Sequence, residues 1–341
     1  MIPIKGYATF HPLKHCLVGR NFSPNFFLKN VGHKKAADAL ARIAEETEED
    51  YLSLIDILKK ANITTYRPDF NEDEYKNNFH GRPPISPRDH FAVIGKTFYA
   101  THKTNYYGNI LKNISKENLF LQNWDYKSCL TTTANITRVG KDLFWDIKEE
   151  NLRGKEFGLD KQKDIIDYLK KKWEDEGFRV HISSRGYHND GVYCVVKPGV
   201  IVSLYDVQNY NDFFPNWEVL YLPDQGANAI RPFTNKWLNK VRGRWWVEGE
   251  EKNEELFKFV NSWLSEWVGY VEETVFDVNM LSIDENTIIC NNYNKEVFDF
   301  FKKHKVEPIV FNFRHRFFWD GGVHCVTQDF YREGNMEDYF G

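Results

Sequence analysis

The fold of this 341-residue chain is decided by a repeated unit, whose clearest copy begins with Ile136-Thr137-Arg138-Val139-Gly140-Lys141-Asp142-Leu143-Phe144. Two short apolar runs flank a glycine bend, which is the composition of a β-hairpin. An amphipathic helix is predicted over residues 161–176, where Ile165, Leu169 and Trp173 fall on one face. Residues 178–182 have the pattern of a third strand. The unit is therefore strand, strand, helix, strand.

Parts of the same unit recur along the chain. Further hairpins are predicted where turn residues separate apolar runs, at 91–100, 192–204 and 278–290. Helices and following strands are predicted at 35–60 with 64–67 and at 295–305 with 307–311, and a further helix within 103–116. The strand at 323–330 would complete the last unit. About five such units favour a radial arrangement over one open sheet.

We interpret the chain as one domain, residues 1–341. The segment 224–273 falls outside the repeat and contains five tryptophans, Trp237, Trp245, Trp246, Trp263 and Trp267. It is predicted to be an insertion that either packs on the rim or forms a lid.

Bulk properties exclude several functional classes. The formal net charge is −4, whereas nucleic-acid binding requires a basic face. No window approaches the ~18 apolar residues needed to span a bilayer, and the N-terminus lacks the features of a secretory signal, so we expect a cytoplasmic protein without membrane association. The five cysteines are odd in number and lack CxxC spacing, so neither a disulfide framework nor a zinc site is indicated.

Cys325 is the candidate nucleophile. It follows a glycine pair in Asp320-Gly321-Gly322-Val323-His324-Cys325-Val326-Thr327. Glycines permit close approach of a substrate, which a core cysteine does not need. The alternative is a buried structural thiol after a tight turn. His324 is adjacent, but on a strand its side chain would point to the opposite face, which makes it a poor partner and a bystander.

His188 is the preferred base. Asp190 lies two positions further, and residues two apart on a strand share a face, so imidazole and carboxylate are expected in one pocket. The alternative for this pair is ordinary polar structure. Asp89, in Ser86-Pro87-Arg88-Asp89, would on its own be a turn with an exposed ion pair.

These residues gain weight as an ordered set of motifs across residues 11–341. The motifs are Pro12-Leu13-Lys14-His15-Cys16-Leu17-Val18-Gly19-Arg20, Pro87-Arg88-Asp89, Arg138-Val139-Gly140-Lys141-Asp142, His188-Asn189-Asp190, Asn279-Met280-Leu281-Ser282-Ile283-Asp284-Glu285 and Gly321-Gly322-Val323-His324-Cys325-Val326-Thr327. In this order they resemble the amidinotransferases of the guanidine-modifying (pentein) superfamily, typified by arginine:glycine amidinotransferase. The last motif looks more like the transferases than like the arginine deiminases.

The resemblance implies a five-bladed α/β propeller with pseudo-fivefold symmetry. It implies that Cys325 attacks the guanidinium carbon, that His188 shuttles protons, and that Asp89 and Asp190 bind the guanidinium. An amidino group would move from an arginine-like guanidino donor to an amine acceptor through a covalent amidino-cysteine, without metal or organic cofactor. By resemblance alone a homodimer is expected.

The chain also departs from the family. Thr132 and Asn135 occupy positions where the family has the acid that orients its histidine, and the stretch 206–208 lacks the arginine that binds the donor carboxylate. Our hypothesis is that the guanidinium pocket persists while the donor or acceptor differs from arginine and glycine. The alternatives are a deiminase-like guanidine hydrolase and a catalytically weakened guanidinium-binding protein.

Overall fold

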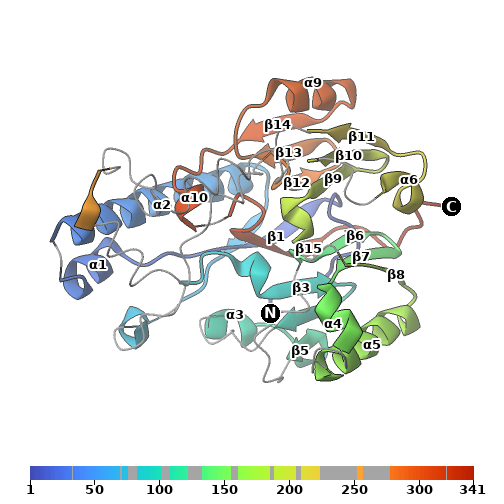
Figure 1. The fold of residues 1–341 in the computed structure, drawn as a ribbon, viewed down its shortest axis with the longest axis horizontal. Coiled ribbons are helices and arrows are strands. Elements are labelled where there is room, and N and C mark those ends of the chain that lie inside the picture. Colours follow the sequence, from blue (N-terminus) through green and yellow to red (C-terminus); the bar gives the residue numbers. More distant parts are fainter. Residues whose placement is uncertain are drawn as a thin grey trace.

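The structure, a computed structural model, describes residues 1–32, 34–69, 71–75, 83–100, 107–121, 133–154, 160–184, 188–204, 209–222, 252–255, 277–319 and 321–341. Within these residues the chain forms five small sheets with helices around them, a mixed α/β fold (Figure 1). The insertion predicted at 224–273 lies outside the described residues except for 252–255.

Every sheet has three strands in the same pattern. The first two strands are antiparallel, and the third is parallel to the middle one. The sheets are β3 (Phe91–Ile94), β4 (Thr97–Ala100) and β5 (Leu119–Leu121); β6 (Ile136–Val139), β7 (Asp142–Asp146) and β8 (Arg179–Ser183); β9 (Tyr193–Lys197), β10 (Val200–Ser203) and β11 (Glu218–Tyr221); β12 (Leu281–Asp284), β13 (Thr287–Cys290) and β14 (Glu307–Val310); and β15 (Thr327–Arg332), β1 (Leu13–Val18) and β2 (Thr64–Tyr66).

The four predicted hairpins are confirmed, and their turns have the expected chemistry. Gly95, Gly140 and Gly199 have φ of 59°, 65° and 80°, which glycine adopts without steric cost. The fourth hairpin has no glycine in its turn. There the Asp284 side chain stabilises the turn, because its Oδ1 accepts from Asn286 N at 2.8 Å. The short strands β5 and β11 had no prediction of their own.

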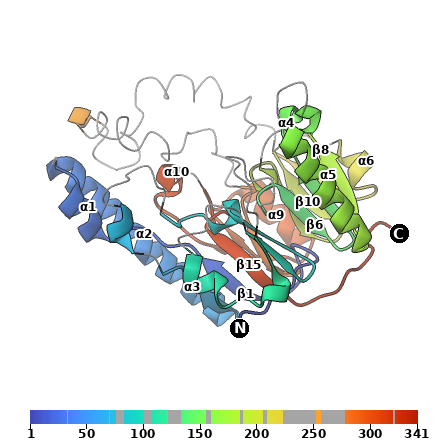
Figure 2. The same ribbon diagram turned by 90° about the horizontal axis from the view of Figure 1, so that it is seen from below.

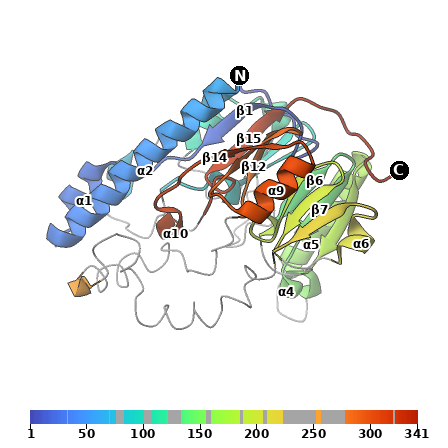
Figure 3. The same ribbon diagram turned by 90° about the horizontal axis from the view of Figure 1, so that it is seen from above.

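The helices cover the outside of the sheets (Figures 2 and 3). They are α1 (Pro24–Asn30), α2 (Lys34–Lys60), α3 (Gly108–Leu111), α4 (Glu149–Arg153), α5 (Asp160–Asp175), α6 (Tyr210–Phe213), α9 (Lys295–Lys303) and α10 (Arg316–Trp319), with 3₁₀ turns η1 (Glu72–Tyr75), η2 (Pro87–Asp89), η4 (Lys116–Asn118) and η6 (Asn189–Gly191). The predicted helices correspond to α2, α5, α9 and the short α3. α2 contacts β2, α5 contacts β8 and α9 contacts β14. None of the described helices is long and apolar enough to cross a bilayer.

Five hydrophobic clusters join neighbouring sheets in a closed cycle. One cluster joins the β1 and β3 sheets, the next the β3 and β6 sheets, and the third the β6 and β9 sheets. The fourth joins the β9 and β12 sheets, and the fifth joins the β12 sheet back to β1. Each sheet thus buries apolar side chains against two neighbours, and the core is distributed around a ring.

The fifth sheet combines both ends of the chain. β15 pairs with β1 antiparallel, with Val18 opposite Thr327, and β1 pairs with β2 in parallel. The prediction that the last strand completes a unit is confirmed, although β15 begins at Thr327 rather than at residue 323.

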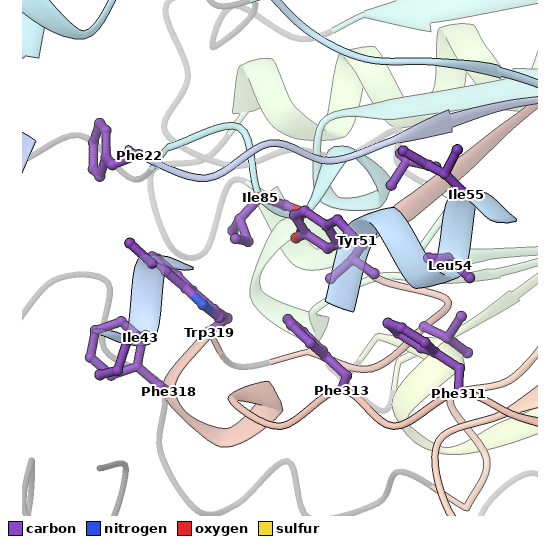
Figure 4. Close-up of a cluster of buried hydrophobic side chains, with 14 of the residues drawn as sticks. Phe22, Ile43, Tyr51, Leu54, Ile55, Ile85, Phe311, Phe313, Phe318 and Trp319 are labelled. Atoms are coloured by element: carbon purple, nitrogen blue, oxygen red, sulfur yellow. Dashed lines mark hydrogen bonds between the residues drawn. The ribbon is translucent and has the colours of Figure 1, made fainter. Parts of the chain in front are cut away.

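The segment that leads to Cys325 is anchored on α2 (Figure 4). Trp319 of α10 is fully buried, and its Nε1 donates to Thr47 Oγ1 at 2.8 Å. Phe318 and Phe313 pack in the same cluster, where Tyr51 stacks on Phe313. The anchor places the glycine pair that follows α10 at a fixed position next to η2.

Candidate active site

Cys325 lies in a tight turn before β15. Residues 323–326 form the turn, in which Val326 N donates to Gly322 O (3.1 Å) and Thr327 N to His324 O (3.2 Å). The interpretation of this segment as a strand is therefore wrong, and strand alternation does not determine where its side chains point. Cys325 itself is buried.

Asn279 holds the thiol and the turn together. Its Nδ2 donates to Cys325 Sγ at 3.0 Å, and its Oδ1 accepts from the backbone N–H groups of His324 (3.0 Å) and Cys325 (3.3 Å). Asn291 supports it, because Asn291 Nδ2 donates to Asn279 O at 2.6 Å. A hydrogen bond donated to sulfur stabilises a thiolate more than a thiol. Sequence reasoning missed this role, and the only signal was the position of Asn279 at the head of a motif.

Asp190 faces the thiol from the neighbouring turn η6. Cys325 Sγ donates to Asp190 Oδ2 at 3.5 Å, and Asn279 Nδ2 also donates to the Asp190 backbone oxygen at 3.2 Å. Asn189 fixes η6 by donating to Asn135 O and Phe144 O, both at 3.0 Å. The structure thus brings the predicted nucleophile and one predicted carboxylate into direct contact.

His324 is not a bystander. Its Nδ1 lies 2.7 Å from Asp190 Oδ2, the oxygen that also contacts Cys325. Burial and the Arg88 charge lower the pKa of His324 to about 4, so the ring is neutral at neutral pH. Burial would raise the pKa of Asp190, but the His324 hydrogen bond and nearby positive charge outweigh it and hold that pKa below its usual value.

His188 lies within ion-pair distance of Asp89. Its Nδ1 lies 3.9 Å from Asp89 Oδ1, an ion-pair distance longer than a hydrogen bond. Residues 189–191 form a 3₁₀ turn, so the strand expected to place His188 and Asp190 on one face is not formed, but His188 still contributes to the lowered pKa of Asp190. η2, which carries Asp89, is joined to the nucleophile turn because Arg88 N donates to Cys325 O at 3.4 Å.

The positions at which the chain departs from the family are only partly visible. Thr132 and the stretch 206–208 lie outside the described residues. Asn135 Nδ2 donates to Asp146 O at 3.3 Å, which ties it to the end of β7. Among the described carboxylates, Asp89 is the one within ion-pair distance of His188.

A buried ionic cluster lies behind the site. Asp329 on β15 accepts from Arg88 Nη1 at 2.6 Å, from Arg332 Nε at 2.9 Å and from Arg138 Nη2. All four residues are at most 2% exposed. Arg88 also donates to His324 O at 3.0 Å, so the cluster supports the turn that carries the thiol.

A cavity of about 30 Å³, with room for about two water molecules, is lined by residues of both the site and this cluster. Asp190 and His324 line it, as do Arg138 and Arg332. Arg138 and Thr9 also belong to the lining, and Arg138 Nε and Thr9 Oγ1 have no hydrogen-bond partner among the described residues, which buried water commonly supplies.

Comparison with solved structures identifies the architecture. SxtG, an amidinotransferase of the saxitoxin pathway from Microseira wollei, is 16% identical with a TM-score of 0.67, and 99% of this chain and 100% of that chain are covered. The inosamine-phosphate amidinotransferase StrB1 from Streptomyces griseus is 17% identical with a TM-score of 0.66, and 99% of each chain is covered. The chain has the amidinotransferase fold. DDAH from Pseudomonas aeruginosa is similar at 10% identity and a TM-score of 0.54, over 94% of this chain and 100% of that chain.

No family model matches the sequence, and no curated protein matches it. In this amidinotransferase fold the predicted site residues come from three separate segments: η2, η6 with His188 before it, and the turn before β15. No group of three or more histidine, cysteine, aspartate or glutamate side chains in the described part of the chain is placed to hold a metal ion.

Gly322 is expected to tolerate no side chain. A Cβ there would lie 2.6 Å from Asn279 Oδ1 and 2.7 Å from Asn291 Nδ2, so Gly322→Ala must displace both amides. We expect a loss of about 1–3 kcal/mol in the free energy of unfolding and slower alkylation of Cys325 by iodoacetamide. Gly108→Ala, whose Cβ meets nothing within 4 Å, is the matched control. Equal alkylation rates in the two variants would contradict the role given to Asn279.

Stability is expected to fall in mild acid. His11 Nε2 lies 2.9 Å from the Tyr339 hydroxyl, and burial, with nearby arginines, lowers the pKa of His11 to about 4, as for His324. Unfolded histidine has a pKa near 6.5, so between pH 6.5 and 4 the unfolded chain binds protons that the folded chain does not. From these two groups the free energy of unfolding is therefore fully retained above pH 6.5 and falls towards pH 4, by up to about 1.4 kcal/mol per pH unit per histidine.

Urea unfolding at several pH values measures this slope. The glutamine amide in His11→Gln can still donate to the Tyr339 hydroxyl. The variant is expected to reduce the slope of the free energy of unfolding against pH by the contribution of one proton, up to about 1.4 kcal/mol per pH unit. An unchanged slope in this variant would show that His11 is not held neutral.

Proposed function

We propose that the protein is a cysteine-dependent amidinotransferase. It would be a single domain, residues 1–341, built as a five-bladed α/β propeller with pseudo-fivefold symmetry. The closed cycle of five clusters and the repeated strand pattern support this architecture. Location in the cytoplasm and a homodimer stay predictions from the sequence.

The contact between a thiol and a carboxylate carries the proposal. Cys325 Sγ lies 3.5 Å from Asp190 Oδ2, and Asp89, which follows the Arg88 whose backbone bonds to Cys325, lies 3.9 Å from His188. A carboxylate beside a thiol opposes ionisation of the sulfur, so this arrangement by itself makes a poor nucleophile. A bound guanidinium reverses the effect, because its delocalised positive charge pairs with the carboxylates and favours the thiolate. The site is therefore suited to a cationic planar substrate.

The reaction follows from these positions. Cys325 Sγ forms a bond to the guanidinium carbon of the donor while Asp190 and Asp89 hold the guanidinium nitrogens. The bond from that carbon to the donor nitrogen then breaks, and His188 gives a proton to the departing amine. The amidino group remains on sulfur. An acceptor amine attacks the same carbon and loses a proton to His188, and the C–S bond breaks to restore the thiolate.

A guanidine hydrolase is the second candidate, since DDAH shares the fold at a lower TM-score. The same thiol and carboxylates would serve it, but water would resolve the intermediate. The two amidinotransferases cover 99% of the chain with TM-scores of 0.66 and 0.67, which favours the transferase.

Intact-mass measurement after incubation with guanidino compounds tests the proposal. A panel of arginine, agmatine and methylguanidine is offered first without and then with primary amines. We expect an adduct of one amidino group on Cys325, with release of the donor amine, and removal of the adduct when an amine is added. An adduct that retains the donor carbon chain and releases ammonia would indicate a hydrolase.

Two variants control this experiment. Cys325→Ala is expected to form no adduct, whereas Cys290→Ser, which changes another buried thiol, should behave as the parent. Failure of every guanidine to modify Cys325 would contradict the proposal. Ornithine release from arginine with glycine as acceptor would instead contradict our hypothesis that donor or acceptor differs from that pair.

A further inference from the structure

His324 is the residue of the site for which the proposed mechanism has no role. We infer that it is a positioning residue, which uses its Nδ1–H to fix the Asp190 carboxylate so that Oδ1 faces the guanidinium of the substrate. The inference rests on the proposed function, because it concerns how the guanidinium site is held in place.

The two oxygens of Asp190 have different surroundings. Oδ2 accepts from His324 Nδ1 at 2.7 Å and contacts Cys325 Sγ at 3.5 Å. Oδ1 accepts no hydrogen bond from any described residue. A carboxylate tethered at one oxygen cannot rotate freely about its Cβ–Cγ bond, so the second oxygen keeps a fixed direction for a charge-assisted hydrogen bond.

The backbone of His324 is fixed on both sides. Its N–H donates to Asn279 Oδ1 at 3.0 Å, and its carbonyl oxygen accepts from Arg88 Nε at 3.0 Å and Thr327 Oγ1 at 3.1 Å. The ring is therefore placed by groups that do not depend on the Asp190 carboxylate, although Asn279 also contacts the Asp190 backbone oxygen. The ring can act as a rigid support rather than follow the carboxylate.

The ionisation state suits this role. Burial and Arg88 hold the pKa of His324 near 4, so the neutral ring donates one hydrogen bond without adding a positive charge. Asp190 then keeps its full negative charge for the substrate. A protonated histidine at the same place would compete with the guanidinium for the carboxylate.

Two alkylating reagents of the same shape separate positioning from general packing. Chloroacetamidine carries an amidinium cation, whereas chloroacetamide is neutral, and in both the Cys325 thiolate displaces chloride with formation of a C–S bond. The ratio of the two alkylation rates at Cys325 reports recognition of the cation. A change in thiol exposure or in overall stability alters both rates and leaves the ratio unchanged.

Leucine and asparagine at position 324 are matched in shape, but only asparagine has an N–H donor near the place of Nδ1. We expect His324→Leu to lower the rate ratio by about tenfold or more, the loss typical of a hydrogen bond to a charged group. His324→Asn should keep the ratio within about threefold of the parent. His324→Gln, whose amide lies nearer the place of Nε2, should lose it as leucine does.

The outcomes separate the inference from the proposed function. Each rate is divided by the rate of the same reagent with a small free thiol, which corrects for intrinsic reactivity. A parent protein that reacts with both reagents at the same corrected rate would contradict guanidinium recognition itself. A parent that prefers the cation, together with an undiminished preference in His324→Leu and His324→Gln, would overturn the role of His324. If His324→Leu fails to fold, the contrast between the asparagine and glutamine variants decides the question.

Discussion

Replacement of Asp329 by asparagine is expected to lower the free energy of unfolding by at least about 3–5 kcal/mol, the usual cost of breaking a buried ion pair from one side. The carboxylate is 1% exposed and accepts from Arg88, Arg138 and Arg332. Burial alone would raise the pKa of Asp329, but the three guanidinium groups hold it well below its usual range. Without the charge, three buried cations remain beside one another with no counterion at that point.

Denaturant unfolding measures the effect, and Asp299→Asn is the control. Asp299 also pairs with a cation, Lys295, but its side chain is 64% exposed. An exposed pair of this kind contributes at most about 0.5 kcal/mol. If the two variants lost similar amounts, the buried cluster would not be a stabilising element of the ring. We also expect Asp329→Asn to slow alkylation of Cys325, because Arg88 links the cluster to the nucleophile turn.

Asp190→Asn is expected to reduce activity more than Asp329→Asn does. We expect a loss of about 10²–10⁴ in kcat/KM for the guanidino donor. The estimate combines the charge-assisted hydrogen bond that Oδ1 makes to the guanidinium, about 1.5–3 kcal/mol, with the cost of an amide N–H that then faces the cation unpaired, about 1–3 kcal/mol. Asparagine has nearly the same shape, and its amide oxygen can still accept from His324 Nδ1. The substitution therefore removes the negative charge and leaves the local packing in place.

Steady-state kinetics with the donor found by the mass experiment checks this prediction. Asp299→Asn should retain the parent activity, because Asp299 lies on the exposed face of α9 and pairs only with Lys295 among the contacts described for it. Asp89→Asn should also lower kcat/KM, because Asp89 faces His188 and the proposed guanidinium pocket. An active Asp190→Asn protein with unchanged donor KM would remove Asp190 from the guanidinium site.

Local sequence rules predicted most of the repeated elements. A bend of glycine, or of aspartate and asparagine, between apolar runs defines a hairpin within about ten residues, so 91–100, 136–144, 192–204 and 278–290 could be found without long-range information. The amphipathic helices α2, α5 and α9 followed from periodicity for the same reason. β2 and β14 are as short but follow longer amphipathic helices, whereas β5 and β11 were missed because the helices before them have only four residues and mark no unit in the sequence.

The predicted site residues lie near one another in the structure, but their local geometry differs from the prediction. Cys325, Asp190, Asp89 and His188 were all named, and the structure places them in neighbouring segments. The strand geometry expected around His188 and at 323–326 was wrong, because the chain forms turns at 189–191 and 323–326. A turn of three or four residues changes the direction of every side chain in it, and no periodic pattern marks such a turn.

The sequence by itself therefore determined the repeating unit and singled out the thiol and the carboxylates as candidates, since each depends on residues close together in the chain. Only the tertiary structure decided the closure of β15 on β1, the hydrogen bonds of Asn279 to Cys325 and of His324 to Asp190, and the burial of Asp329 among three arginines. These contacts join residues 46 to more than 300 positions apart or depend on the exact local turn. Their partners are chosen by how the five sheets pack around the ring, which neither spacing nor composition encodes.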